Sequence, residues 1–373
     1  MKRASILLTG ATGAVGSDLL RSLVQRDGVR LNVLVRHSDR SPADRIKALL
    51  GDTALAASIT VLEGDISAGP RLGMHDLAVA SLRRETTHII HCAGSTSFTL
   101  DLADARAANV QGSRNVLEFA RACPALECGA FLSTVYVSGK RCGDFSEFDF
   151  GDAGLGFVNT YEESKAEMEA VIQSAMKELP LILVRLSTLV GDSTTGRVNQ
   201  FNTVHHAIRL LYSGLAPMIP GDPNEPVDFV SSDFVAAAAL HLVEHAPRPG
   251  VYHLAAGKES SNTLGDIIDE TMAALASFRP QWRKRAVERP LIVDLDTYEL
   301  FVRSVEETGN PVLRDATRSI RTFAYQLAHP KVFETSQAAA TLAWNGIAPQ
   351  QSLAFYPRVV RYCLESNWGR RAC

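Results

Sequence analysis

The sequence has few cysteines, few aromatic residues and no long apolar run. Its 373 residues include six cysteines and 7% aromatic side chains. The cysteines are too sparse for a disulfide framework and lack the paired CxxC spacing of a structural zinc site, so no metal is expected. No apolar run reaches the roughly 20 residues that span a bilayer. The N-terminal MKRASILLTG turns glycine-rich too early for a secretory signal. These absences predict a cytoplasmic protein without a transmembrane segment.

Neither sign of charge is in excess. Lys and Arg number 38 against 41 Asp and Glu, a formal net charge of -3. A general nucleic-acid-binding protein normally has a basic surplus, so no nucleic-acid partner is expected. At about 150 residues per domain, the length permits two domains or one large unit with a cap. The sequence leaves the oligomeric state open.

The first half of the chain alternates short apolar runs with amphipathic stretches. Runs such as residues 5–10, 31–36 and 59–65 consist mainly of Val, Ile and Leu, whereas residues 14–25 repeat apolar side chains at helical spacing. Further strands are expected at 88–94, 129–139, 180–191 and 251–257, and further helices at 108–123 and 230–245. Buried strands of parallel sheets have such near-continuous apolar runs. The pattern predicts an α/β fold with a Rossmann-type doubly wound parallel sheet.

A glycine-rich turn, TGATGAVG, lies between the first expected strand and the first expected helix. Gly10 allows a tight turn, Gly13 lets a phosphate approach the backbone, and Gly16 permits close packing of helix on strand. The N–H groups and positive end of such a helix attract a pyrophosphate. The strand before the turn and the helix after it favour a dinucleotide site over a chance match. Candidate cofactor contacts are therefore Thr9, Gly10, Thr12, Gly13, Ala14, Val15 and Gly16.

The end of the second expected strand distinguishes the two nicotinamide cofactors. An acidic residue there binds the ribose 2′-OH of NAD, whereas an arginine attracts the 2′-phosphate of NADP. This chain has Arg36 at that position, and Arg45 follows on the next expected helix. The alternative is a solvated surface arginine. We expect NADPH in preference to NADH.

Three side chains suit acid–base chemistry on a substrate oxygen. Tyr161 and Lys165 stand four residues apart in TYEESKAEME, so they share one face of the expected helix. A neighbouring ammonium is expected to lower the phenol pKa from its usual value of about 10 and so make the tyrosine a usable proton donor. Thr134, at the end of the fifth expected strand, can offer a hydroxyl to the same oxygen. The YxxxK spacing alone is common, but together with the glycine turn it predicts the catalytic set Thr134, Tyr161 and Lys165.

The motifs together resemble the extended short-chain dehydrogenase/reductase family. The segments LVRHSDRSPADRIKALL, VLEGDIS, HIIHCAGSTSF, NVQGSRNVLEFA, FLSTVYVSG, VGDSTTG and IPGDPNEPVDFVSSDFVAAA follow in the order typical of its thioester reductase and fatty acyl-CoA reductase (male sterility) branch. This resemblance extends from Thr9 to about Gly257. One departure is visible, since the family usually has proline after the arginine of the sixth strand, where this chain has Leu186.

The resemblance implies further cofactor contacts. Asp65 and Ile66 would lie beside the adenine, and Cys92, Ala93 and Gly94 would lie under the middle of the cofactor. Leu186 and Thr188 would meet the nicotinamide amide, and Asn109 would orient Lys165 through water. A nucleotide-binding Rossmann domain is thus expected over residues 1–192, with a returning segment at about 226–257. Residues 193–225 and 258–373 would form a smaller, mostly helical substrate-binding cap.

The resemblance also implies a reaction. The expected activity is NADPH-dependent hydride transfer to the carbonyl of a thioester-activated acyl group, delivered on CoA or an acyl carrier protein, to give an aldehyde or an alcohol. The same residues would serve a ketone or ring reductase acting on a free secondary metabolite. A sugar-nucleotide epimerase would instead recycle NAD, which Arg36 disfavours. A non-catalytic NADP-sensing protein would need the glycine turn but not the Thr134, Tyr161 and Lys165 set.

Overall fold

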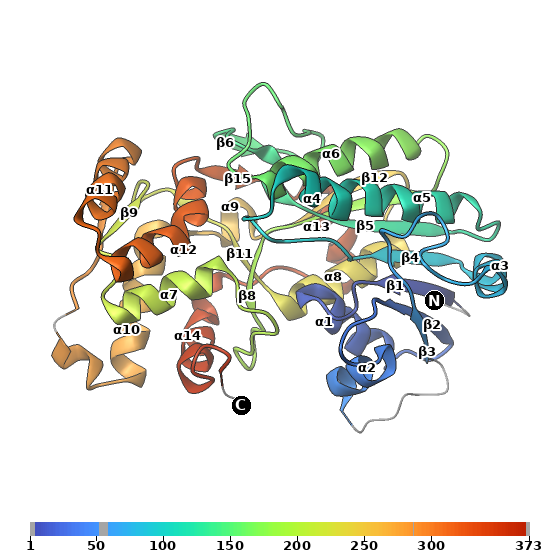
Figure 1. Cartoon of the computed structure of the whole chain (residues 1–373), viewed down its shortest axis with the longest axis horizontal. Coiled ribbons are helices and arrows are strands. Elements are labelled where there is room, and N and C mark those ends of the chain that lie inside the picture. The colour runs from blue at the N-terminus through green and yellow to red at the C-terminus, as the bar shows by residue number, and fades with distance from the viewer. Residues whose placement is uncertain (1–3, 52–58, 286, 371–373) are drawn as a thin grey trace.

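A parallel sheet forms the centre of the computed structural model, which describes residues 4–51, 59–285 and 287–370 (Figure 1). Its seven strands lie in the order β12-β7-β5-β4-β1-β2-β3. The strands are β1 (Ala4–Thr9), β2 (Val29–Val35), β3 (Ile59–Glu63), β4 (His88–His91), β5 (Cys128–Thr134), β7 (Leu181–Leu186) and β12 (Gly250–Leu254). The chain winds outward from β1 in one direction and from β4 in the other, so the predicted doubly wound fold is confirmed.

Helices cover both faces of this sheet. They are α1 (Ala14–Leu23), α2 (Pro42–Leu50), α3 (Asp76–Glu85), α4 (Leu102–Arg106), α5 (Gly112–Arg121), α6 (Thr160–Ala175), α8 (Ser232–His245) and α13 (Ser336–Leu342). Ile6 and Leu8 of β1 are buried with side chains of α1, α2, α8 and α13, whereas Leu7 is buried with side chains of α3, α5 and α6. Because β1 is covered on both sides, it has no polar face and its sequence is a continuous apolar run.

Polar side chains fix where several helices begin. Asn159 accepts a hydrogen bond from the backbone N–H of Glu162 at the start of α6, and Ser231 does the same for Phe234 at the start of α8. α1 differs, because its first-turn N–H groups follow Gly13 and no side chain caps them. The positive end of α1 is therefore left for a ligand.

The helix expected over residues 108–123 is divided in the structure. α4 leads into a π-helical turn at Ala107–Gln111, and α5 follows directly. Such turns shift the following side chains around the helix axis and are frequent at functional sites. Asn109 lies in the π turn and is buried.

A second lobe lies to the left of the parallel sheet in Figure 1, away from β1, β2 and β3. Its helices are α7 (Thr203–Ser213), α10 (Leu264–Phe278), α11 (Leu295–Thr308), α12 (Pro311–Leu327) and α14 (Tyr356–Glu365). Short elements elsewhere are β6 (Gly143–Phe145), β8 (Thr188–Gly191), β9 (Met218–Pro220), β10 (Pro226–Val227), β11 (Phe229–Ser231), α9 (Gly257–Ser260), β13 (Asn262–Thr263), β14 (Leu291–Val293) and β15 (Lys331–Phe333), with 3-10 turns at Val135–Ser138, Trp282–Arg285, Ala343–Asn345 and Ser352–Ala354. Among the helices of the described ranges, none has both the length and the apolar character needed to cross a bilayer.

Residues 331–347 differ from the expected partition, which placed them in the cap. β15 pairs with β6 of the first lobe, and Ala338 and Leu342 of α13 are buried in the core beneath the sheet. The Lys-Val-Phe run of β15 is too short to indicate a partner, since strand pairing at this sequence distance is decided by tertiary packing.

Candidate active site

Four neighbouring strands end at the same edge of the sheet. Thr9 of β1 is paired with His91 of β4, and Thr134 of β5 is paired with Leu186 of β7. Ligands of open α/β sheets bind at the carboxyl ends of the strands, where the strand order changes direction. The glycine turn, Thr134 and the start of α6 all lie at this edge.

Tyr161 and Thr134 are brought into direct contact. Tyr161 occupies the first turn of α6, and its side chain is hydrogen-bonded to that of Thr134, the last residue of β5. The ring of Phe98 lies 5.5 Å from the Tyr161 ring, centroid to centroid. Burial raises the pKa of Tyr161 to about 12, and the hydrogen bond to Thr134 opposes that shift. Tyr161 therefore holds its proton at neutral pH and can donate it.

Lys165 lies one helical turn after Tyr161 and is buried. Its Nζ donates to the carbonyl oxygen of Leu132 at 2.7 Å and contacts Met168 Sδ at 3.2 Å. Burial lowers the pKa of Lys165 to about 8, and the charge of Glu169 opposes that shift. The expectation that Lys165 lowers the pKa of Tyr161 is wrong for this structure, because desolvation of the phenol dominates and the ammonium is bound to a backbone carbonyl.

Asn109 connects the loop after β4 to the catalytic helix. Its Nδ2 donates to Ser95 O at 3.1 Å and to Ser164 Oγ at 3.0 Å, while its Oδ1 accepts from Ser95 N at 2.8 Å. A Cβ at Gly94 would lie 2.7 Å from that same Oδ1. Asn109 thus fixes the position of Ser164, which precedes Lys165. Because Gly94 has no side chain, it leaves room for the side chain of Asn109.

The glycine turn has the shape that a bound pyrophosphate needs. Gly10 has φ +75°, and a Cβ there would lie 2.5 Å from Ala93 N. A Cβ at Gly16 would collide with the carbonyl of Gly10, whereas a Cβ at Gly13 would meet only Gly10 O at 3.3 Å. Gly13 therefore presents open backbone beside the uncapped start of α1, where Ala14 and Val15 follow. These residues fit a nicotinamide dinucleotide.

Thr9 faces the interior rather than the turn. Its Oγ1 lies 2.7 Å from His91 Nδ1, and His91 Nε2 lies 3.1 Å from Ser113 Oγ. Burial lowers the pKa of His91 to about 3, so the imidazole is neutral. The side chain of Thr9 therefore stabilises the end of β1 against the end of β4.

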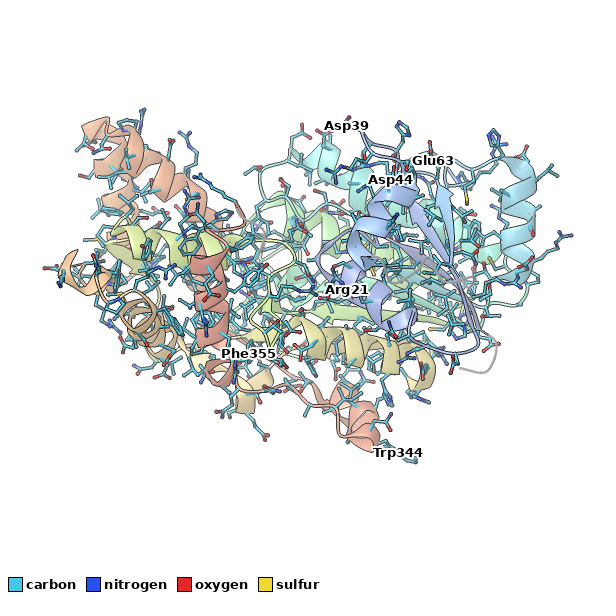
Figure 2. All side chains as sticks on the ribbon, turned by 90° about the horizontal axis from the view of Figure 1, so that it is seen from below. Arg21, Asp39, Asp44, Glu63, Trp344 and Phe355 are labelled. Carbon is cyan, nitrogen blue, oxygen red and sulfur yellow. The ribbon has the colours of Figure 1, made fainter. Side chains whose placement is uncertain are left out.

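Arg45 joins the glycine turn to the end of β2. Its two terminal nitrogens donate to Arg36 O at 2.8 Å and to Thr12 Oγ1 at 3.0 Å. Asp39, Asp44 and Glu63 gather at the same end of the sheet domain (Figure 2). Asp44 accepts a hydrogen bond from Ser41 Oγ, and Glu63 lies 3.2 Å from His37 Nδ1. The Arg45 guanidinium therefore lies between the glycine turn and the residue that follows β2, close to these acidic side chains.

Asp65 and Ile66 follow the end of β3, and Cys92 directly follows β4. Asp65 Oδ1 accepts from Ser67 N at 2.8 Å, and Ile66 O accepts from Asn115 Nδ2 at 2.7 Å. Burial raises the pKa of the Cys92 thiol to about 12, so it stays a neutral, weakly polar group and not a nucleophile.

Tyr136 is a site residue that the sequence prediction omitted. Its hydroxyl lies 2.8 Å from Oγ1 of Thr188, which starts β8, and Leu186 ends the adjacent β7. Tyr136 lines a cleft between the lobes, together with Asp228 and Lys331. The available signal was its place two residues after Thr134 in STVYVSG. The Tyr136 hydroxyl thus ties the turn after β5 to the start of β8.

Burial shifts two of the charged groups that line this cleft, Lys331 and Asp228, toward their neutral forms. The pKa of Lys331 is lowered to about 8, and that of Asp228 is raised from its ordinary value. The Asp228 carboxylate accepts from the backbone N–H groups of Ala256 and Gly257, both at 2.9 Å. Asp228 therefore holds the loop after β12.

Comparison with known proteins assigns the chain to a family. Residues 8–239 match a family model of NAD-binding domains described as male sterility protein. The isonitrile lipopeptide synthase of Streptomyces coeruleorubidus is 31% identical over 279 residues, which are 71% of this chain and 18% of that protein. The glycine betaine reductase of Emericella nidulans is 28% identical over 67% of this chain and 21% of that protein. The chain thus spans about a fifth of the length of these two relatives.

A third relative matches over more of its own length. The probable fatty acyl-CoA reductase 5 of Arabidopsis thaliana is 24% identical over 344 residues, 72% of this chain and 69% of that protein. Among solved structures, the terminal R domain of the myxalamid PKS-NRPS pathway has a TM-score of 0.80 at 22% identity, covering 100% of this chain and 93% of that chain. A thiolation-reductase di-domain from an archaeal non-ribosomal peptide synthetase has a TM-score of 0.75 at 21% identity, covering 99% and 76%.

The same fold also occurs in a sugar-nucleotide enzyme. UDP-glucuronic acid 4-epimerase from Bacillus cereus, solved with NAD, has a TM-score of 0.67 at 17% identity, covering 98% of this chain and 99% of that chain. At such identities the solved structures establish the fold, whereas the family model covers more than half of the chain. The chain therefore belongs to the male sterility family of NAD-binding proteins, a branch of the extended short-chain dehydrogenase/reductase oxidoreductases.

Proposed function

We propose that this protein is an NADPH-dependent reductase that acts on the carbonyl of a thioester-activated acyl group carried by CoA or an acyl carrier protein. The observation that carries the proposal is the hydrogen-bonded pair of Tyr161 and Thr134, with Lys165 one turn along α6. The thioester class is favoured because relatives include a fatty acyl-CoA reductase and the solved structures include a thiolation-reductase di-domain.

The side chains have complementary roles in this reaction. A bound nicotinamide cofactor supplies the hydride. As negative charge develops on the substrate oxygen, the hydroxyls of Thr134 and Tyr161 donate hydrogen bonds to it, and Tyr161 then gives up its proton. Preorganised donors of this kind contribute about 3 kcal/mol each to transition-state stabilisation. Lys165 provides a buried positive charge one helical turn along the same face of α6.

Expulsion of the thiol completes the first reduction. The protonated tetrahedral adduct is a hemithioacetal, whose collapse releases the thiol and leaves an aldehyde. The same donors would serve a second reduction of that aldehyde to the alcohol.

The choice of NADPH rests on the end of β2. Arg36 is exposed there, and Arg45 is held close to it by hydrogen bonds to Arg36 O and Thr12 Oγ1. Arginine pairs with phosphate through directed, charge-assisted hydrogen bonds. The two side chains therefore favour the 2′-phosphate of NADPH over the free 2′-OH of NADH.

A substrate panel tests the proposal. The protein is incubated with NADPH or NADH and with decanoyl-CoA, a decanoyl-loaded acyl carrier protein or cyclohexanone, and aldehyde and alcohol are quantified by gas chromatography. We expect NADPH-dependent product from a thioester and little from the ketone. NADPH consumption with the free ketone alone would reject the acyl assignment.

A pair of arginine variants extends this experiment to the cofactor. Arg36→Ala should lower the kcat/KM ratio of NADPH to NADH by at least about tenfold, since the loss of a charge-assisted phosphate contact costs about 1.5 kcal/mol or more. Arg30→Ala removes a guanidinium from β2 that pairs with Glu85, and serves as the control. An unchanged ratio in Arg36→Ala would remove this arginine from the cofactor site.

A further inference from the structure

The chain after β8 forms a strap, residues 192–199, that lies between the cap and α1. Its backbone closes on itself, because Asp192 N donates to Arg197 O at 2.9 Å and Gly196 N donates to Asp192 O at 2.8 Å. The Asp192 carboxylate also accepts from the N–H and the hydroxyl of Thr195, both at 2.7 Å. The shape of the strap is therefore fixed by its own hydrogen bonds.

Both α8 and α14 hold the strap in place. Ser193 donates through N and Oγ to the carboxylate of Asp233, in the first turn of α8, at 2.8 and 2.7 Å. Arg358 of α14 donates to Ser193 O at 3.2 Å, and a Cβ on Gly196 would lie 2.2 Å from Arg358 O. Val198 is buried with side chains of α7, α10 and α14. The residues on either side of Val198 are thus presented from a rigid support.

These two residues, Arg197 and Asn199, contact the beginning of α1. Asn199 Nδ2 donates to Asp18 Oδ2 at 2.7 Å and to Ala14 O, the carbonyl of the first residue of α1, at 3.4 Å. Arg197 Nη2 lies 3.6 Å from Asp18 Oδ1. The strap therefore reaches the part of α1 that directly follows the glycine turn, which belongs to the segment that matches the NAD-binding family.

The contact between strap and helix carries a surplus of positive charge. Asp18 Oδ1 is already bound by Arg21 Nη1 at 2.9 Å, closer than Arg197. One carboxylate and two guanidinium groups leave a net charge of +1 among these three side chains. That charge lies beside the positive end of α1, where a cation is unfavourable and an anion is favoured. The arrangement is therefore suited to an anion bound at the glycine turn.

We propose that Arg197 pairs with the pyrophosphate of the nicotinamide cofactor, and that Asp18 and Asn199 position this arginine by holding the strap on α1. The inference rests on the proposed function in one respect, the presence of that cofactor at the glycine turn. The pyrophosphate supplies the anion, and its oxygens accept charge-assisted hydrogen bonds from a guanidinium. Because NADPH and NADH share the pyrophosphate, Arg197 serves both cofactors equally, in contrast to Arg36.

Cofactor binding measured without turnover tests the proposal. Dissociation constants of NADPH and NADH are determined from the fluorescence of the reduced nicotinamide with wild-type protein, Arg197→Ala and Arg361→Ala. We expect Arg197→Ala to weaken both cofactors by the same factor, at least about tenfold, because each loses one charge-assisted phosphate contact. Arg361→Ala removes a guanidinium of α14 that pairs with Glu365, so both wild-type values should be kept. Unchanged binding in Arg197→Ala, or weakening of NADPH alone, would overturn the assignment.

A charge-removing variant separates an electrostatic role from a purely structural one. Asp18→Asn keeps nearly the same shape and can still accept from Asn199, but it removes the negative charge that competes with the cofactor for Arg197. We expect Asp18→Asn to bind NADPH and NADH at least as tightly as the wild type. Weaker binding in Asp18→Asn, to the same extent as in Arg197→Ala, would mean that the strap only needs to stay attached, and it would contradict the role given to the Arg197 charge.

The proposed function and this inference fail separately. If the wild type binds both cofactors, the variants show the expected pattern and no thioester is reduced, the acyl assignment fails and the Arg197 contact stands. If thioesters are reduced and Arg197→Ala binds both cofactors like the wild type, only the Arg197 contact fails.

Discussion

At the scale of residues, the proposed reaction depends on two buried ionisable side chains, Tyr161 and Lys165, which lie one helical turn apart on α6. Burial raises the pKa of Tyr161 to about 12 and lowers that of Lys165 to about 8. Desolvation disfavours the charged form of each group, so it favours the neutral phenol of Tyr161 and disfavours the ammonium of Lys165. At neutral pH Tyr161 is a phenol able to donate, and Lys165 is still charged.

The pH dependence of turnover follows from these two values. We expect kcat/KM to stay level around neutral pH and to fall as the pH rises through about 8, because Lys165 then loses its proton while Tyr161 keeps its own. A pH–rate profile measures this. Lys331→Met is the matched control, since burial also lowers the pKa of Lys331 to about 8, and this variant should retain the alkaline fall. A profile that stays level well above the pKa of Lys165 would contradict its role as a charged group.

Lys165 and Lys331 also make the stability of the fold depend on pH. For stability, raising the pH is favourable, whereas for turnover it is unfavourable. Their pKa is lower in the folded protein than the ordinary value of 10.5, so the unfolded chain binds more protons between those limits. The cost of burying the ammonium groups is present below pH 8 and is relieved as the pH rises from about 8 toward 10.5. Their contribution to the free energy of unfolding therefore increases over that interval.

Sequence spacing was sufficient to place Tyr161 and Lys165 one turn apart on a helix and Thr134 at a strand end, whereas their catalytic roles stay predictions. Sequence spacing could not predict their pKa values, because the desolvation comes from residues far apart in the chain. It also could not predict Tyr136, whose role depends on its hydrogen bond to Thr188. Local pattern fixes which residues share a helix face, whereas burial is a tertiary property.

At the scale of elements, α6 is anchored to β7 by a fully buried ion pair. Arg185 donates through Nε and Nη2 to the Glu169 carboxylate at 2.7–3.1 Å. The guanidinium also lies 5.1 Å from the ring centres of Phe145 and Phe150. Glu169 is one turn beyond Lys165, so this pair fixes the rotation of the catalytic helix against the sheet.

Breaking that ion pair should destabilise the protein strongly. Arg185→Met leaves the Glu169 carboxylate buried without its partner, and we expect a loss of about 3–5 kcal/mol in the free energy of unfolding. Urea denaturation measures it. The double variant Arg185→Met with Glu169→Leu removes both charges and should recover much of the loss. A loss under about 1 kcal/mol in Arg185→Met would show that the pair does not anchor α6.

The strands and helices of the sheet domain were largely predictable because their apolar runs are long. The departure from the family at Leu186 has a local explanation, since β7 continues through it, paired with Thr134 on one side and Leu254 on the other. The π turn at Ala107–Gln111 was not predictable, because it has the same apolar spacing as an ordinary helix over so few residues.

At the scale of the whole molecule, a buried hydrogen bond joins the cap to α6. Gln326 of α12 donates to the Glu162 carboxylate at 2.7 Å, and Glu162 directly follows Tyr161. Glu147, next to β6, accepts hydrogen bonds from backbone N–H groups of β12 and α13, namely those of His253 and Ala338, and these contacts hold parts of the sheet domain together. The contact between Gln326 and Glu162 therefore ties α12 of the cap to the first turn of α6.

The change in composition after Gly191 was enough to predict a cap, but not its full path. Residues 331–347 return to the sheet domain through pairings and burial that join positions nearly two hundred residues apart, for example Phe333 with Phe145. Such contacts follow from the complete fold and leave no local signature in so short a segment.

The central claim is most directly tested by comparing wild-type protein and Tyr161→Phe for NADPH-dependent aldehyde formation from decanoyl-CoA, with NADPH binding followed by fluorescence in both. Phenylalanine keeps the ring beside Phe98 and removes the hydroxyl bonded to Thr134. We predict a fall in kcat of at least about a hundredfold with NADPH binding retained, as expected for the loss of a general acid. Turnover by Tyr161→Phe close to that of the wild type would contradict the account.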